Sequence, residues 1–315
     1  MTNPVLVEVV RSGFVESTHR GALVITAPDG SVRFSAGDIE RPVYPRSSNK
    51  PLQAVGMLRA GLTIDDEDLA LGCGSHNGEP GHVEGALSML SRADLTEDAL
   101  ACPPAFPLHE PSMLAVAASG KRRAAMNCSG KHAAMLTTCA QLGWPTEDYA
   151  AATHPLQKVI QATIADLTGE TIETVGVDGC GAPLFAFSLT GLARSFGRLV
   201  TAMGGPDRRV ADAVRAYPWQ VAGTGREDTV LMRGVDGLLS KGGAEGVHAF
   251  ALPDGTALAL KIDDGNARAR IPLLLATLRH LGIDPGEEAG DLARNAVLGG
   301  GKPVGELRVV AGLFG

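Results

Sequence analysis

Residues 21–37, GALVITAPDGSVRFSAG, are two β-rich runs on either side of a Pro-Asp-Gly turn, and a stretch of the same kind, VHAFALPDGTALALKI, lies at 247–262. Proline, aspartate and glycine in this order favour a tight turn, so each stretch predicts a β-hairpin. Further strand-like runs open and close the chain, VLVEVV at 5–10 and GELRVVAGLF at 305–314. The sequence therefore predicts an antiparallel sheet built from both ends of the chain.

Between the two hairpins most of the chain has helical periodicity. Six such runs are bounded by typical helix start and stop residues, at 48–61, 80–90, 130–143, 155–169, 188–203 and 206–217. A last helix is expected from about Asn266, with Pro272 in its first turns. We expect one α+β domain over 1–315, with the sheet from about 1–45 and 235–315 and a helical region at about 46–234. The first and last helices are expected to share one face of the sheet.

The composition excludes several classes of function. Hydrophobic residues make up 44% and charged residues 20%, and the net charge of −7 is spread without a basic tract. Nucleic acid and anionic membranes are therefore not expected as partners. The first residues, MTNPVLVEVV, carry no basic segment ahead of the apolar run, so a cytoplasmic protein is expected. Five cysteines in such a chain argue against a disulfide framework.

The stretch YPRSSNKPLQA, residues 44–54, places Ser47 and Lys50 one helical turn apart at a predicted helix start. Serine is a common N-cap and proline is common in a first turn, so the simplest interpretation of Ser47 is a cap. A chemical interpretation rests on two later triplets, Ser75-His76-Asn77 and Lys241-Gly242-Gly243. Serine β-lactamases and penicillin-binding proteins use S-x-x-K, S-D-N and K-T-G in this chain order.

A serine hydroxyl is a weak nucleophile and needs a base within hydrogen-bond reach. A lysine can be that base only if its pKa falls, through burial or through another nearby cation. Lys50 and Lys241 in one pocket would lower each other's pKa. The three motifs together favour Ser47 as a nucleophile over Ser47 as a plain cap.

Two cysteines in glycine-rich loops form a second cluster. Cys128, Lys131 and His132 lie in MNCSGKHAAML, and Asp178 and Cys180 lie in GVDGCGAPL. The two thiols could meet to bind a soft metal such as zinc. They could equally be a thiolate nucleophile activated by His132, or buried apolar residues. The spacing alone leaves all three interpretations open.

Other polar residues suggest roles in holding a substrate. His76 and His82 do not fit a metal-ligand spacing on a helix, so we expect them to orient a substrate or support the site. Lys261 ends a predicted strand, and Arg226, in GTGREDT, has a guanidinium that matches a carboxylate in two places. A surface pair of Arg226 with Glu227 or Asp228 is the alternative.

Taken together, the chain resembles the asparaginase II family, the third structural class of bacterial L-asparaginases. The matching stretches run in order over nearly the whole chain: VESTHRG (15–21), RSSNKPLQA (46–54), SHNGEP (75–80), NCSGKHAAML (127–136), DGCGAP (178–183), GTGREDTVLM (223–232), SKGGAEG (240–246) and KIDDGNAR (261–268). The resemblance implies a fold similar to serine β-lactamases and serine-dependent glutaminases, and hydrolysis of L-asparagine to L-aspartate and ammonia.

The resemblance also implies a role for individual residues. It implies two Ser–Lys pairs, Ser47 with Lys50 and Ser75 with Lys241, and a homodimer. It implies a Zn²⁺ site whose ligands are Cys128, Lys131 and Cys180, and Lys131 can ligate only as a neutral amine. The remaining candidates, expected to contact substrate, are His76, Asn77, Asp178, Arg226 and Lys261. Two alternatives are a hydrolase of another amide, such as glutamine or a peptide, and a catalytically silent binding protein with the same fold.

Overall fold

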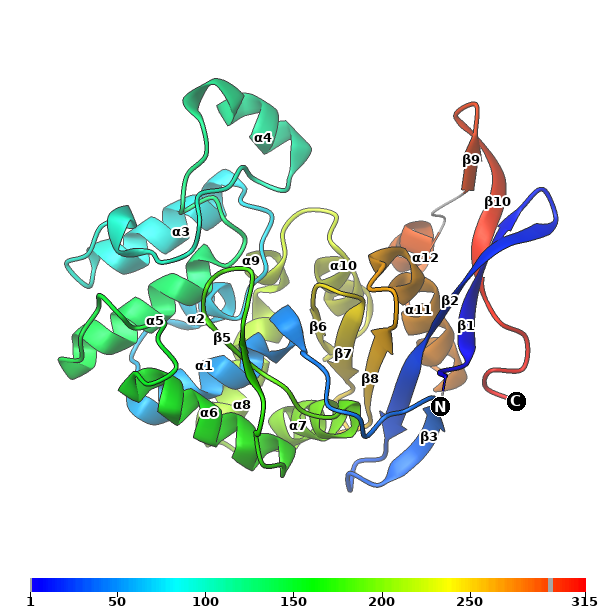
Figure 1. The fold of residues 1–315 in the computed structure, drawn as a ribbon, viewed down its shortest axis with the longest axis horizontal. Coiled ribbons are helices and arrows are strands. Elements are labelled where there is room, and N and C mark those ends of the chain that lie inside the picture. The colour runs from blue at the N-terminus through cyan, green and yellow to red at the C-terminus, as the bar shows by residue number, and fades with distance from the viewer. Residues whose placement is uncertain (1, 294–296) are drawn as a thin grey trace.

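A computed structural model describes residues 2–293 and 297–315, and shows a curved antiparallel sheet beside a helical region (Figure 1). Across the main sheet the strand order is β6-β7-β8-β2-β1-β10-β9, and β3 pairs with β2. The strands are β1 (Val5–Arg11), β2 (Phe14–Thr26), β3 (Val32–Ala36), β6 (Leu239–Gly242), β7 (Val247–Ala251), β8 (Ala257–Ile262), β9 (Val297–Gly299) and β10 (Lys302–Val309). The predicted α+β class, with a sheet from both chain ends, is confirmed.

The two Pro-Asp-Gly stretches form the predicted hairpins, β2–β3 and β7–β8. In each, the turn aspartate accepts a hydrogen bond from the backbone two residues on. Asp29 Oδ1 accepts from Ser31 N at 2.9 Å, and Asp254 Oδ1 accepts from Thr256 N at 2.8 Å. The same local chemistry therefore closes both turns, because an aspartate side chain bonds the backbone two residues ahead of it.

The described helices lie mostly between the hairpins. They are α1 (Lys50–Ala60), α2 (Asp66–Gly72), α3 (Pro80–Ser91), α4 (Glu110–Val116), α5 (Ser129–Leu142), α6 (Pro155–Thr168), α7 (Leu189–Thr201), α8 (Gly205–Ala216), α9 (Pro218–Val221), α10 (Glu227–Gly234), α11 (Arg270–His280) and α12 (Glu287–Ala293). One short two-stranded sheet, β4 (Val175–Val177) with β5 (Pro183–Phe185), also falls in the region predicted to be helical.

The sheet is covered on both faces, and by different helices from those expected. Leu23 and Ile25 of β2 point into a core shared with α11, whereas Ala22 and Val24 point into a core shared with α7. The expectation that the first and last helices share one face of the sheet is therefore wrong. The last predicted helix, α11, covers one face, and α7 rather than α1 covers the opposite face. The α7 face of β7 and β8 carries alanines, which let a helix approach closely.

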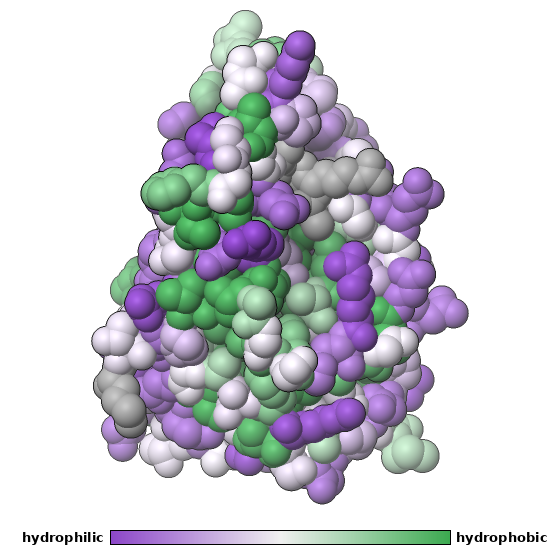
Figure 2. Space-filling view, turned by 90° about the vertical axis from the view of Figure 1, so that its right-hand side faces the viewer, coloured by the Kyte–Doolittle hydropathy of each residue, from purple (hydrophilic) through white to green (hydrophobic). Residues whose placement is uncertain are grey.

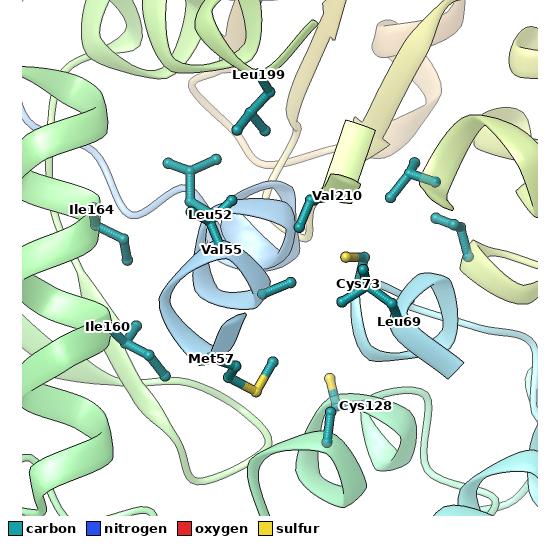
Figure 3. Close-up of a cluster of buried hydrophobic side chains, with 14 of the residues drawn as sticks. Leu52, Val55, Met57, Leu69, Cys73, Cys128, Ile160, Ile164, Leu199 and Val210 are labelled. Carbon is teal, nitrogen blue, oxygen red and sulfur yellow. The ribbon is translucent and has the colours of Figure 1, made fainter. Parts of the chain in front are cut away.

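The first helix, α1, is instead surrounded by other helices. Leu52 and Val55 of α1 lie among Ile160 and Ile164 of α6 and Leu199 of α7 (Figure 3). Both α1 residues are fully buried. This packing fixes the start of α1 at the junction between the helical region and the sheet, where β6 and β7 contact the turn before α1.

The face at the right of Figure 1 is turned toward the viewer in Figure 2, where hydrophobic side chains gather in the middle of the surface among hydrophilic ones. Exposed apolar side chains on the strands of this side include Phe14, Val32, Leu298 and Val304. Within the described residues, no helix combines the length and apolar character needed to cross a bilayer.

Candidate active site

Ser47 lies in a short 3-10 turn, Arg46–Asn49, that leads directly into α1. The backbone carbonyl of Ser47 accepts from the Lys50 N–H, but its side chain makes no capping hydrogen bond. The interpretation of Ser47 as a plain N-cap is therefore wrong. Arg46 has a positive φ of 53°, a conformation that costs energy for a non-glycine residue and is often found at functional sites.

A chain of hydrogen bonds joins the Ser47 hydroxyl to a buried amine. Ser75 Oγ donates to Ser47 Oγ at 2.8 Å, and Lys50 Nζ donates to Ser75 Oγ at 3.2 Å. Lys50 Nζ also donates to the Gly74 carbonyl and lies 3.1 Å from Cys128 Sγ. Lys50 thus reaches Ser47 through Ser75, and the structure brings the first two motifs into one relay.

The loop that carries Ser75 joins α2 to α3 and is held by backbone hydrogen bonds on two sides. Ser75 N donates to Val221 O at 2.8 Å, and Asn77 N donates to Ala222 O at 2.8 Å. From the other side, His76 N donates to Asn127 O at 3.1 Å. An extended segment fixed in this way holds the Ser75 hydroxyl in one place.

The third motif, Lys241-Gly242-Gly243, contacts the Ser47 turn through Gly243. Gly243, just after β6, packs so closely on the Ser47 turn that a methyl group there would lie 2.6 Å from Pro45 O and 3.2 Å from Ser47 N. Lys241 is fully buried, and its Nζ lies 3.1 Å from Asp228 Oδ2. Burial lowers the pKa of Lys241, and the Asp228 carboxylate opposes that shift. No hydrogen bond joins Lys241 to Ser75 among the described residues.

Three candidate substrate contacts lie beside Ser75. His76 is fully buried, and burial holds its pKa well below the ordinary value. Its Nε2 contacts Ser129 Oγ at 3.0 Å and its Nδ1 accepts from Gly78 N at 3.1 Å, so protein groups occupy both nitrogens. Arg226 Nη1 donates to Asn77 Oδ1 at 3.1 Å. Asn77 is also buried, and its Nδ2 donates to Thr224 O at 3.0 Å. Of the three residues, the half-buried Arg226 has the side chain that could turn toward a ligand.

Two further candidates, Asp178 and Lys261, lie near Arg46, the residue before Ser47. Arg46 Nε donates to Asp178 Oδ1 at 2.8 Å, and Arg46 Nη1 lies 3.7 Å from Glu245 Oε1. Arg46, Glu245 and Lys261 line a cavity of about 560 Å³. Lys261 Nζ donates to the Glu245 carbonyl at 2.7 Å, so it braces the loop that forms the cavity wall.

The cysteine cluster lies directly behind the relay. Lys131 Nζ lies 3.1 Å from Cys180 Sγ, and the hydrogen bond with Cys128 lowers the pKa of Cys180 well below its ordinary value. The same hydrogen bond, with burial, raises the pKa of Cys128. Burial lowers the pKa of Lys131, but the Cys180 and Cys128 sulfurs outweigh burial and raise it. The Lys131 amine and the Cys180 sulfur therefore face each other directly.

The donor set of this cluster fits a zinc ion on chemical grounds. Two sulfur ligands and one nitrogen ligand suit Zn²⁺, provided that the ion displaces the Lys131 proton. Asp178 Oδ2 lies 3.7 Å from Cys180 Sγ. Among the described residues, no group of three or more histidine, cysteine, aspartate or glutamate side chains could hold a metal.

The sequence did not single out Arg46, Asp228 or the outer partners of the site. Asp228 appeared only as a surface partner for Arg226, but the structure buries it against Lys241 and pairs Glu227 with Arg270. The signal for Asp228 was its place inside the GREDT stretch, beside Arg226. Arg46 precedes Ser47 in RSSNK, where the sequence carries no signal for it. Its positive φ, which is unusual for a residue other than glycine, appears only in the structure.

A comparison with solved structures found several matches of low identity, among them two β-lactamases and Mglu. A putative β-lactamase from Bacteroides dorei DSM 17855 is 16% identical, with 82% of this chain and 92% of that chain covered and a TM-score of 0.44. A β-lactamase from Mycobacterium bovis is 17% identical, with 78% and 88% covered and a TM-score of 0.40. A native form of Mglu is 14% identical, with 90% and 66% covered and a TM-score of 0.39.

A search of the curated proteins found no match. A scan against protein-family models matched the L-asparaginase II model over residues 7–309. This range includes the Ser47 turn, the Ser75 loop, both cysteines and the end of β6. The family supports an amide-hydrolysing activity. Because the match spans nearly the whole chain, the protein belongs to the L-asparaginase II family.

Proposed function

We propose that this protein hydrolyses L-asparagine to L-aspartate and ammonia, with Ser47 as the nucleophile. The observation that carries the proposal is the relay from Ser47 Oγ through Ser75 Oγ to Lys50 Nζ, with contacts of 2.8 and 3.2 Å. A hydroxyl within one such relay of an amine is the arrangement that a serine nucleophile needs. Its setting, in a member of an amidohydrolase family, makes an amide the substrate class.

In the proposed reaction Lys50 acts as a neutral amine. Ser47 passes its proton to Ser75, Ser75 passes its own proton to Lys50, and the Ser47 oxygen bonds to the amide carbon. The carbon–nitrogen bond then breaks, the nitrogen leaves with a proton as ammonia, and an ester to Ser47 remains. Water attacks that ester by the same relay, which releases L-aspartate and restores Ser47.

Groups on both sides of Ser47 would hold the charged ends of asparagine. Arg226, with Asn77 beside it, offers a guanidinium to the α-carboxylate. Asp178, which the Arg46 guanidinium now holds, offers a carboxylate to the α-ammonium. We assign Lys261 and His76 supporting roles, since their polar atoms already bind protein groups.

We also propose that Cys128, Lys131 and Cys180 hold one Zn²⁺. A bound zinc would act as a Lewis acid or lower the pKa of a bound water. We favour a role in shaping the pocket wall, because the Ser47 relay already supplies a nucleophile and a base. The 3.1 Å contact of Lys50 with Cys128 joins the two sites directly.

Ammonia release from a panel of amides tests the proposed activity. Purified protein is given L-asparagine, L-glutamine, a short asparagine peptide and acetamide, with Ser47→Ala as the blank. Release from asparagine alone supports the proposal. Release from another amide instead makes the protein a hydrolase of that substrate, and release from none identifies a catalytically silent relative.

Metal analysis of the purified protein tests the zinc site. We expect about one zinc per chain, and loss of zinc in the double variant Cys128→Ser, Cys180→Ser, which keeps some turnover but binds substrate less well. Cys139→Ser is the matched control, because Cys139 is buried elsewhere in α5. If the wild-type protein contains no metal, Cys128 and Cys180 are buried core residues and not metal ligands.

The homodimer, which the family suggests, and the cytoplasmic location stay proposals. Light scattering coupled to gel filtration measures the first. A mass near 65 kDa, twice the chain mass of 32.5 kDa, is the expected result.

A further inference from the structure

A buried carboxylate, Asp228, lies behind the site and is not used by the reaction described above. It is the second residue of α10 and is 2% exposed. Asp228 Oδ2 lies 3.1 Å from Lys241 Nζ, and Asp228 Oδ1 accepts from Ser240 Oγ at 3.2 Å and from the Gly242 N–H at 2.8 Å. One carboxylate therefore binds three consecutive residues of β6.

These contacts act at both ends of the Lys241–Gly243 segment. Lys241 Nζ donates to its own strand at Gly242 O, 2.7 Å away, so the ammonium and the strand end move together. Gly243 follows at once and packs on the backbone of Ser47 and Ser48. A shift of Asp228 would therefore be transmitted to the turn that carries the nucleophile.

We propose that Asp228 is a positioning residue that holds Lys241 as an ammonium ion and fixes the end of β6 against the Ser47 turn. The proposal rests on the proposed amide hydrolysis for its kinetic effect. In that reaction, a fixed positive charge beside the turn favours the negative charge that develops when Ser47 attacks. Lys50 is then the base, and Lys241 is the cation until its own proton is lost at alkaline pH.

The buried position of Lys241 makes a charge partner necessary. An ammonium in a dry site is costly unless a carboxylate faces it, and burial lowers the pKa of Lys241 while Asp228 opposes that shift. The charged groups around Lys241 are Asp228 from α10, Lys50 from α1 and Arg226 ahead of α10. Behind Asp228 lie His248 of β7 and the pair of Glu227 with Arg270.

The test reads the charge of Lys241 directly. The chain has seven lysines, so protein labelled with ¹³C at lysine Cε gives few signals, and Lys241→Arg identifies the one from Lys241. Titration without substrate compares wild type, Asp228→Asn and the control Asp212→Asn, a surface carboxylate paired with Arg208 and Arg215. This measurement stands or falls separately from asparagine hydrolysis.

We expect the Lys241 midpoint to fall by about one pH unit or more in Asp228→Asn and to stay in place in Asp212→Asn. On an active substrate, the alkaline limb of kcat/KM should move by the same amount, and kcat should fall about tenfold or more. In a Lys241→Arg background the limb should not move, because guanidinium does not titrate there. An unmoved Lys241 midpoint in folded Asp228→Asn would overturn the proposal.

Asp228→Asn could fail to fold, because it leaves a buried ammonium unpaired. The double variant Asp228→Asn, Lys241→Gln removes both charges and then decides the matter. Recovery of folding in the double variant supports the ion pair. If both variants fail to fold equally, the Asp228 carboxylate is needed only for its hydrogen bonds to β6. That result would refute the assignment of Lys241 as its charge partner.

Discussion

At the scale of single residues, the hydroxyl of Ser47 accepts a hydrogen bond from Ser75 and makes no capping hydrogen bond to the helix. Ser47→Ala should abolish turnover and cost about 0.5–1.5 kcal/mol of unfolding free energy, the usual size of one hydrogen bond. Ammonia release and urea unfolding measure the two effects.

Ser195→Ala is the matched control for this variant. Ser195 is a fully buried serine of α7 whose hydroxyl donates only to Leu192 O of the same helix, at 2.7 Å. It should keep wild-type turnover. A folded Ser47→Ala protein with activity within a few fold of wild type would remove Ser47 from the role of nucleophile.

The identity of the base is also a question of residues, and pH answers it. The proposed base is an amine, and lysine bases in enzymes commonly work at about pH 7–8 or above. We expect kcat/KM to rise through neutral pH, then to fall when the buried Lys241 loses its proton. Rates measured from pH 5 to 10 check this. An optimum at pH 5–6 would point to a histidine or carboxylate base.

At the scale of elements, the contact between the end of β6 and the Ser47 turn depends on Gly243 having no side chain. A methyl group there would lie 2.6 Å from Pro45 O, closer than packed atoms tolerate. Gly243→Ala should therefore displace the turn, lower kcat about tenfold or more and cost about 1–3 kcal/mol of stability.

A second glycine provides the comparison for Gly243→Ala. Gly204, before α8, has an extended φ of 170° and nothing within 4 Å of an added methyl group. Gly204→Ala should leave both kcat and the urea midpoint near wild type. If Gly243→Ala were equally silent, β6 would not position the nucleophile.

At the scale of the whole molecule, buried neutral histidines make stability depend on pH. Burial lowers the pKa of four histidines, namely His76, His82, His132 and His248. For His248 it brings the pKa to about 3. Unfolded histidine titrates at about 6.5, so below that pH the unfolded chain binds protons that the folded chain does not. Their contribution is thus complete above about pH 6.5 and is lost as the pH falls.

Between pH 7.5 and 5.5, His248 alone should remove about 1 kcal/mol of stability, and the four together a few times that amount. Urea midpoints at pH 7.5, 6.5 and 5.5 measure the loss, and His248→Gln should reduce it. Asp228, whose pKa is lowered, adds its own loss only below about pH 4, outside this window. A urea midpoint that stayed constant from pH 7.5 to 5.5 would contradict the burial of these histidines in their neutral form.

The sequence by itself determined the features that depend on neighbouring residues. Two Pro-Asp-Gly turns predicted both hairpins, because the turn aspartate bonds the backbone two residues away. Glycine predicted the end of α1 at Gly61, where φ is +119°. The family motifs also pointed to Ser47, Lys50, Ser75 and Lys241, which lie around one turn in the structure.

Only the tertiary structure decided which of these residues contact each other. Lys50 binds Ser75, 25 residues away, rather than Ser47 three residues before it. Lys241 binds Asp228, and α7 rather than α1 covers the sheet opposite α11. The physical reason is that turns and helix ends depend on local backbone chemistry, whereas an ammonium in a dry interior takes the partner that chain packing brings within about 3 Å.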